Sequence, residues 1–234
     1  MKLNTESNVY TIVYVTIVVI IVAFLLAFTY AGLKERSDIN EQINKKQQIL
    51  ASLNQRNIAK ESVDSIYKSI VKADLIVNQA GEIIKEGKNQ DQDGFEIARK
   101  DYSKDCLPIY QCEIEGQKKY VLPMVGKGLW GSIWGYISLN EDGKTIYGAY
   151  FAHESETAGL GALINEQKFQ KQFENQTLID TDGTILEVVK SGQAGGSPIK
   201  CDGITGATLT SNGVNQMIQT YVKFFQAYLD SVKQ

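Results

Sequence analysis

The sequence contains few of the residues that build metal sites, with one histidine and three cysteines among 234 residues. The cysteines are Cys106, Cys112 and Cys201, with no Cys-x-x-Cys pair, and the histidine is His153. A zinc or iron–sulfur site made by this chain alone is therefore not expected, and we assign no metal ligand. Cys106 and Cys112 either pair as a disulfide in an oxidising compartment or remain buried free thiols.

The sequence also lacks an excess of basic residues, with 24 Lys and Arg against 27 Asp and Glu and a formal net charge of -3. It has no basic face and no basic stripe studded with aromatic residues, so nucleic acid is not expected as a partner. The Gly-x-Ser-x-Gly elbow of many hydrolases is missing, and any hydrolytic triad would have to use His153. We therefore do not expect a hydrolase.

One long apolar run lies near the N-terminus, where residues 9–33 contain no charged residue. About 20 apolar residues suffice to cross the hydrocarbon core of a membrane as a helix. Tyr10, Tyr14 and Tyr30 lie toward the two ends, as expected of aromatic residues at the headgroup level. The run is too long for a signal peptide, and the following residues make a poor cleavage site. The sequence predicts a tail at 1–8 and an uncleaved transmembrane helix at 9–33.

The charges flanking this run bear on its orientation. Lys2 precedes it, whereas Lys34, Arg36, Lys45 and Lys46 follow it. Counted literally, the positive-inside rule places the C-terminal bulk of the chain in the cytoplasm. No acidic residue lies within the run, so this chain is not expected to form an ion path by itself.

The next part of the chain, residues 34–109, is predicted to form juxtamembrane helices and a connecting loop. Residues 34–55 are polar and helix-favouring, and are expected to continue the transmembrane helix. Apolar residues between Val63 and Val71 recur at helical spacing and predict a second helix. Residues 85–105 are charged and rich in turn formers, which is typical of a surface loop.

From residue 110 to 234 the pattern indicates a globular domain. Short runs rich in Val, Ile, Tyr and Trp predict strands at 120–126, 132–139 and 144–152, the last two joined by an Asn-Glu-Asp-Gly turn. Residues 177–189 predict a further hairpin. A continuous apolar stripe between Val214 and Val232 predicts a closing helix. The expected fold class is α+β: a single N-terminal transmembrane helix, then a globular domain with an antiparallel sheet and packing helices.

Two glycine-rich segments interrupt the predicted strands. In 126–135, Leu129 and Trp130 offer a flat apolar surface, but a tight bend with a core tryptophan is the simpler interpretation. In 153–164, Thr157 precedes two glycines. This segment is either a helix start capped by Thr157 or a loop whose amides face an anion or a ring system.

A third segment, DGITGATLTSNGV at 202–214, crowds four hydroxyl residues directly before the closing helix. The positive end of a helix favours a phosphate. Thr210 or Ser211 acting as helix cap explains one hydroxyl and leaves Thr205 and Thr208 unexplained. The Gly-x-x-x-x-Gly-Lys spacing of a P-loop is absent. The residues alone predict a phosphate-bearing ligand here.

The run DGITGATLT at 202–210 resembles the flavinylation motif of bacterial FMN-binding domains, an Asp followed by Ser or Thr and then Gly-Ala-Thr. The resemblance implies that a flavin transferase joins FMN through its phosphate to Thr208, the last Thr of the motif. It places Thr205, Gly206 and Ala207 in the phosphate turn. It also implies that Asp202 contributes to recognition by the transferase.

The other two segments resemble the same family. Residues 156–161, ETAGLG, are similar to its Glu-Thr-Pro-Gly-Leu-Gly segment, with Ala158 in place of proline. Residues 126–139 are similar to its Gly-x-Gly-Leu-Trp segment. The resemblance implies the cofactor contacts: Leu129, Trp130, Thr157 and Leu160 bracket the flavin ring, and Gly159 allows close approach.

With one span followed by a Leu-Lys-Glu-Arg segment, the layout resembles the C subunits of the sodium-translocating NADH:quinone reductases. This family implies an FMN-carrying electron-transfer subunit of an oxidoreductase and translocase, with the other subunits of the complex as partners. It also implies a single-pass protein of the cell inner membrane with its globular domain on the periplasmic side, against the charge count above. Two alternatives are the G subunit of the ion-translocating ferredoxin:NAD oxidoreductase, which shares the motifs, and a membrane-anchored binding domain without a redox role.

Overall fold

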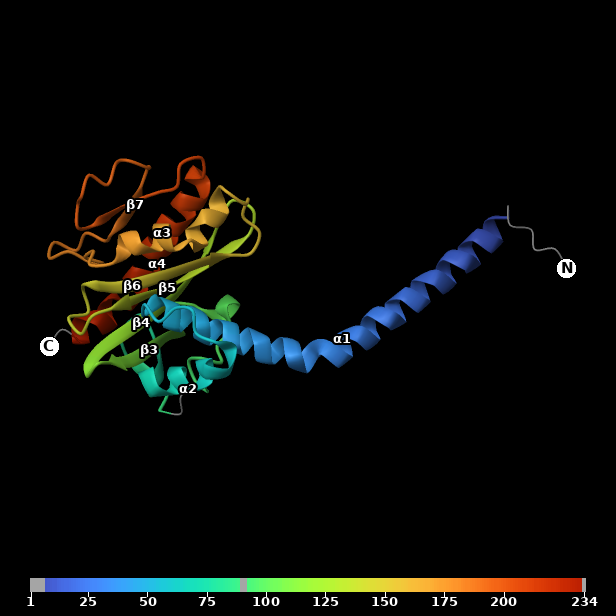
Figure 1. Cartoon of the computed structure of the whole chain (residues 1–234), viewed down its shortest axis with the longest axis horizontal. Coiled ribbons are helices and arrows are strands. Elements are labelled where there is room, and N and C mark those ends of the chain that lie inside the picture. The colour runs from blue at the N-terminus through green and yellow to red at the C-terminus, as the bar shows by residue number, and fades with distance from the viewer. Residues whose placement is uncertain (1–6, 89–91, 233–234) are drawn as a thin grey trace. The chain divides into compact units, whose positions relative to one another are not determined.

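The computed structural model describes residues 7–88 and 92–232 (Figure 1). Most of the predicted N-terminal tail, including Lys2, lies outside the described residues. The chain divides into two compact units, Met1–Lys45 and Lys46–Gln234. Each unit is described by itself.

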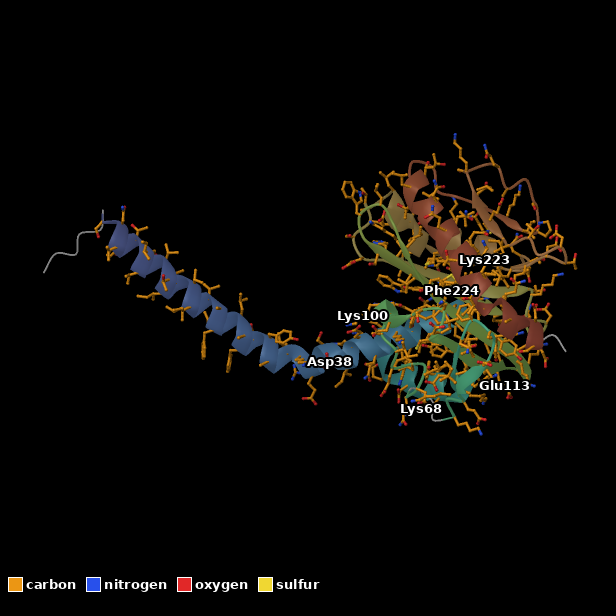
Figure 2. All side chains as sticks on the ribbon, turned by 180° about the vertical axis from the view of Figure 1, so that it is seen from behind. Asp38, Lys68, Lys100, Glu113, Lys223 and Phe224 are labelled. Carbon is orange, nitrogen blue, oxygen red and sulfur yellow. The ribbon has the colours of Figure 1, made fainter. Side chains whose placement is uncertain are left out.

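The first unit consists of most of helix α1 (Asn8–Ser52), which continues without a break past residue 33, as predicted. Its apolar side chains are exposed around the whole circumference, with Phe24 71% and Phe28 72% exposed (Figure 2). A helix that is apolar on all sides needs an apolar environment. Within the described ranges, α1 is the one helix long and apolar enough to cross a membrane, by length and composition.

The second unit is built on a six-stranded antiparallel sheet in the order β2-β1-β3-β4-β5-β6. Its strands are β1 (Val71–Val77), β2 (Ile83–Lys85), β3 (Leu107–Ile114), β4 (Gln117–Lys127), β5 (Ser132–Leu139) and β6 (Ile146–His153). The predicted strands at 120–126, 132–139 and 144–152 agree with β4, β5 and β6. The Asn140–Gly143 turn joins β5 to β6, with Gly143 at a φ of 61°.

The sheet begins earlier in the chain than residue 110. Helix α2 (Lys60–Ile70) lies where a second helix is predicted, but it ends at Ile70 and β1 begins at Val71. Both β1 and β2 therefore belong to a stretch whose pattern predicted only helices and a loop. The apolar spacing that indicated the helix runs on into the strand, which hid their boundary.

Helix α4 (Thr208–Val232) packs on one face of the sheet, and α2 with the end of α1 covers the other (Figures 1 and 2). The α4 side chains that meet the sheet form the predicted stripe: Val214, Met217, Ile218, Tyr221, Val222, Phe225, Tyr228 and Leu229. On the opposite face, Ser138 Oγ donates to the carbonyl of Ser52 at 2.6 Å. The fold class predicted from the sequence is confirmed.

The remaining elements are short. They are the 3-10 helices η1 (Arg99–Asp101), η2 (Gly161–Asn165) and η3 (Lys171–Phe173), helix α3 (Gln167–Gln170), and strands β7 (Glu187–Val189) and β8 (Lys200–Asp202). The predicted turn at Asp182–Gly183 is present, with the Asp180 N–H donating to the Thr184 carbonyl at 2.8 Å. Beyond this turn, β7 pairs in parallel with β8.

Candidate functional site

Three chain segments that are far apart in the sequence meet at one edge of the second unit. The turn between β4 and β5 closes with the Gly128 N–H donating to the Gly131 carbonyl at 2.8 Å. The segment after β6 lies beside it because Ile133 pairs with His153 across β5 and β6. The start of α4 completes the group, since Gly213 packs against the backbone of Lys127. The three glycine-rich segments singled out in the sequence therefore form one site.

A cleft of about 220 Å³ opens between these segments. Its lining residues are Leu129, Glu156, Thr157, Leu160, Gly161, Gly206, Ala207, Thr208, Leu209 and Thr210. Six residues predicted as ligand contacts line it: Leu129, Thr157, Leu160, Gly206, Ala207 and Thr208. The wall is apolar at Leu129 and Leu160, which are 46% and 42% exposed.

Four other predicted site residues do not line the cleft. Trp130 is 67% exposed, and its side chain extends from the β4–β5 turn. Gly159 has a φ of 75°, which a residue with a side chain rarely adopts. The Thr205 hydroxyl donates to Ser191 Oγ at 2.9 Å. Asp202 ends β8 and faces a neighbouring loop.

Thr208 is the first residue of α4, a helix of 25 residues. It is exposed and lines the cleft, and its side chain makes no hydrogen bond within the described part of the chain. The free N–H groups and the dipole at this helix end favour an anion beside it. A free hydroxyl therefore stands where a phosphate would be stabilised.

Thr210 and Ser211 do not cap α4, and this prediction was wrong. The helix begins at Thr208, so both residues lie in its first turn. Ser211 Oγ accepts the Ile204 N–H at 2.9 Å, which fastens the preceding loop to the helix. Thr210 Oγ1 donates to Glu156 Oε2 at 2.5 Å. The apolar pattern of α4 begins only at Val214, so the start of the helix was predicted too late in the chain.

The segment after β6 is a loop followed by η2, so Thr157 does not cap a helix there. Its carbonyl accepts the N–H groups of Leu160 and Ala162, each at 3.1 Å. These bonds close the turn around Gly159. The helix start is therefore excluded and the segment is a loop; that its amides face an anion or a ring system stays a prediction.

Sequence reasoning missed Glu156 as a site residue. Its side chain is 7% exposed, with Oε1 accepting the Trp130 N–H at 2.9 Å. Burial raises the pKa of Glu156, but the Thr210 hydroxyl and the N–H groups of residues 129–131 outweigh it, so the pKa lies below its usual value. The signal was an acid at the head of the ETAGLG segment. The hydrogen-bond partners of Glu156 are distant in the sequence, so no local pattern identifies them.

Asp202 shapes the loop that follows β7. Its Oδ1 accepts the N–H groups of Gln193 and Ala194 at 2.9 and 3.0 Å. That loop contains three glycines at positive φ, namely Gly192, Gly195 and Gly196. The Asp202 carboxylate therefore accepts two backbone N–H groups of this loop.

The cysteines do not take part in the site. Cys106, Cys112 and Cys201 are free thiols, so the disulfide between Cys106 and Cys112 is not formed. Burial raises the pKa of Cys201 to about 12, which leaves its thiol protonated at neutral pH.

This chain matches a protein family and several known proteins. Residues 128–223 match the FMN-binding domain family, a range that includes every residue lining the cleft. The C subunit of the Na(+)-translocating NADH-quinone reductase of Yersinia pestis is 30% identical over 206 residues, covering 78% of this chain and 76% of that protein. The C subunit from Pasteurella multocida is 37% identical over 115 residues, 48% of this chain. The chain spans about half the length of the Pasteurella and Vibrio alginolyticus relatives, 44% and 46%.

A solved structure agrees with these relatives. The crystal structure of the C subunit of the Na(+)-translocating NADH-quinone reductase from Parabacteroides distasonis has a TM-score of 0.77 and 34% sequence identity, covering 84% of this chain and 96% of that one. Both the Yersinia protein and this structure are therefore matched over more than two thirds of their length. The chain belongs to the family formed by the C subunits of the Na(+)-translocating NADH-quinone reductases.

Proposed function

We propose that this chain is the FMN-carrying electron-transfer subunit of a membrane Na+-translocating NADH:quinone oxidoreductase, with FMN joined by a phosphoester to Thr208. The observation that carries the proposal is the position of Thr208: a free hydroxyl at the N-terminus of α4, in the same cleft as three exposed leucines, Leu129, Leu160 and Leu209. FMN supplies the redox chemistry when bound, and the protein supplies tethering, orientation and electrostatics.

The residues of the cleft suit the two halves of FMN. The helix terminus and the turn at Gly206 (φ 80°) suit the phosphate, because backbone amides can approach it closely. Any side chain at Gly206 would also meet Leu160, since a Cβ there would lie 3.0 Å from Leu160 Cδ2. On this proposal Thr205, Gly206 and Ala207 shape the phosphate turn.

The apolar wall suits a flat ring. Leu129, Trp130 and Leu160 are large apolar side chains left substantially exposed, which is unfavourable in water unless a ligand or partner covers them. On this proposal they bracket the flavin ring together with Thr157, and Gly159 keeps the approach open. The names of the relatives, which describe one subunit of a reductase, support the other subunits of such a complex as partners.

The mass of the denatured chain tests the function. Protein produced in a host that contains the flavin transferase is expected to carry one FMN less one water, and to fluoresce as a flavin band on a denaturing gel. A covalent adduct survives denaturation, whereas a ligand held only by the cleft does not. A chain of unmodified mass that released a phosphorylated ligand on denaturation would instead support the binding domain without a redox role.

We also propose that residues 9–33 cross the cell inner membrane once and that the globular unit, with the proposed FMN-binding domain at 110–234, lies on the periplasmic side. The match to the FMN-binding family at 128–223 supports the position of that domain in the chain. Alkaline phosphatase fused after residue 234 is expected to be active, because this enzyme needs the oxidising periplasm. An inactive fusion would place the domain in the cytoplasm, as the flanking positive charges favour.

The proposed role of Asp202 in recognition by the flavin transferase leads to a pair of substitutions. We expect Asp202→Asn to retain most of the flavin attachment and Asp202→Ala to lose most of it, because the asparagine oxygen can still accept the N–H groups of Gln193 and Ala194. The fraction of flavin-bearing chains by intact mass, at limiting transferase, measures the difference. Equal loss in both variants would mean that the transferase needs the negative charge itself.

A further inference from the structure

The three segments of the site are held together by one buried side chain. Glu156 comes from the segment after β6, and its two carboxylate oxygens face different parts of the site. Oε1 accepts the Trp130 N–H at 2.9 Å in the β4–β5 turn. Oε2 accepts the Thr210 hydroxyl at 2.5 Å, in the first turn of α4 and 54 positions away in the sequence. A single carboxylate therefore joins all three segments directly.

The packing around this carboxylate is tight. A Cβ at Gly128 would lie 2.4 Å from Glu156 Oε1, and a Cβ at Gly161 would lie 2.4 Å from Oε2. Gly161 would also place its Cβ 2.6 Å from Thr210 Oγ1. Two glycines of the site therefore have a specific reason to be glycine, which is contact with the Glu156 carboxylate.

The chemistry of the donors favours an ionised carboxylate in this position. Hydrogen bonds to a charged acceptor are stronger than those between neutral groups. A carboxylate bound by backbone N–H groups and a hydroxyl is stabilised in its charged form, although it is buried. Hydrogen bonds of this kind fix both the turn that carries Leu129 and the first turn of α4, which carries Thr208.

We propose that Glu156 is the positioning residue of the flavin site, fixing the Leu129 wall and the Thr208 hydroxyl at a set separation. The role of Glu156 in flavin binding rests on the proposed function, whereas its hydrogen bonds to the two segments are observed independently of that function. Glu156 itself need not touch the reacting atoms. It acts through the Leu129–Gly131 turn on one side and through Thr210 on the other.

Amide hydrogen exchange in the unmodified full-length chain, made without the transferase, tests the geometry. In Glu156→Gln, the amides of residues 129–131 are expected to exchange about tenfold or more faster. Two charged acceptor oxygens are replaced by one neutral amide oxygen and an NH2 group that cannot accept a hydrogen bond. The amides of β3 and the adjoining part of β4 serve as the internal reference and are expected to be unchanged. Glu166→Gln is the matched control, since it removes the same charge from an exposed side chain ten positions further along the chain.

A second pair of variants, at Thr210, tests the positioning role independently if Glu156→Gln does not fold. Thr210→Val removes the hydroxyl but leaves the carboxylate, whereas Thr210→Ser retains the bond to Glu156. We expect Thr210→Val to slow flavin attachment at limiting transferase about tenfold, and Thr210→Ser to restore it. Rescue by serine separates positioning from simple loss of packing.

The outcomes separate this inference from the proposed function. A wild-type chain that takes up no flavin would overturn the function, while exchange at residues 129–131 would still test Glu156. Exchange that is unchanged in Glu156→Gln, or raised uniformly over the sheet, would overturn the positioning role. So would equal attachment rates in the valine and serine variants at Thr210.

Discussion

Replacing Thr208 with valine is expected to abolish the covalent flavin completely. Valine keeps the branched shape of threonine but has no hydroxyl, so no phosphoester can form at this position. Because Thr208 is exposed at the first position of α4, the fold is expected to remain within about 0.5 kcal/mol of wild type. Intact mass and in-gel fluorescence of the denatured chain measure the loss. In the assembled complex, we expect quinone reduction to be lost as well.

Thr205→Val is the matched control for this experiment. Thr205 is an exposed threonine in the same loop, and its hydroxyl donates only to Ser191 Oγ in the described structure. We expect this variant to keep the adduct, at a reduced rate if the phosphate turn is loosened. An adduct of unchanged mass in Thr208→Val would move the attachment to another residue. Loss in both variants would mean that the loop, rather than one hydroxyl, decides attachment.

The segments that form this site could be predicted because their information is local. The run at 202–210 resembles the flavinylation motif, and the glycines of 126–135 and 153–164 mark bends without reference to the rest of the fold. The strands of the central hairpin were also predictable, since alternation and an Asp-Gly turn are local signals. Six of the predicted contact residues consequently line one cleft.

The parts that could not be predicted depend on contacts between distant residues. The bond from Thr210 to Glu156 joins positions 54 apart, and neither residue carries a pattern that points to the other. The hydroxyls of Thr210 and Ser211 look like helix caps because such residues favour that position. Only the packed site shows that both are already used by Glu156 and Ile204.

The place where α4 begins is itself set by tertiary contact. Gly213 lies so close to β4 that a Cβ there would come 2.3 Å from the Lys127 carbonyl oxygen and 3.3 Å from Ile133 Cδ1. Lys127 pairs with Ser132 in the sheet, so its backbone cannot rotate away as a side chain could. This approach holds the first turns of α4 against the sheet, and with them Thr208.

Gly213→Ala is therefore expected to destabilise the domain, although alanine is the better helix former. Intrinsic propensity alone would favour alanine by about 0.8–1.0 kcal/mol. The clash with a fixed backbone carbonyl requires α4 to shift, and overpacking of this kind costs about 1–3 kcal/mol. We expect the free energy of unfolding to fall by a net amount of about 1 kcal/mol. Urea unfolding of the full-length chain in detergent, followed by tryptophan fluorescence, measures the change.

Asn212→Ala provides the control, because Asn212 is exposed at the neighbouring position of the same helix. At this exposed position alanine has the higher helix propensity and meets no clash. The free energy of unfolding is therefore expected to rise by roughly a few tenths of a kcal/mol. Opposite signs at adjacent positions would separate close packing from helix propensity. If Gly213→Ala were instead stabilising, α4 could move away from β4 at little cost. The position of Thr208 would then depend on the loop before the helix rather than on the contact with the sheet.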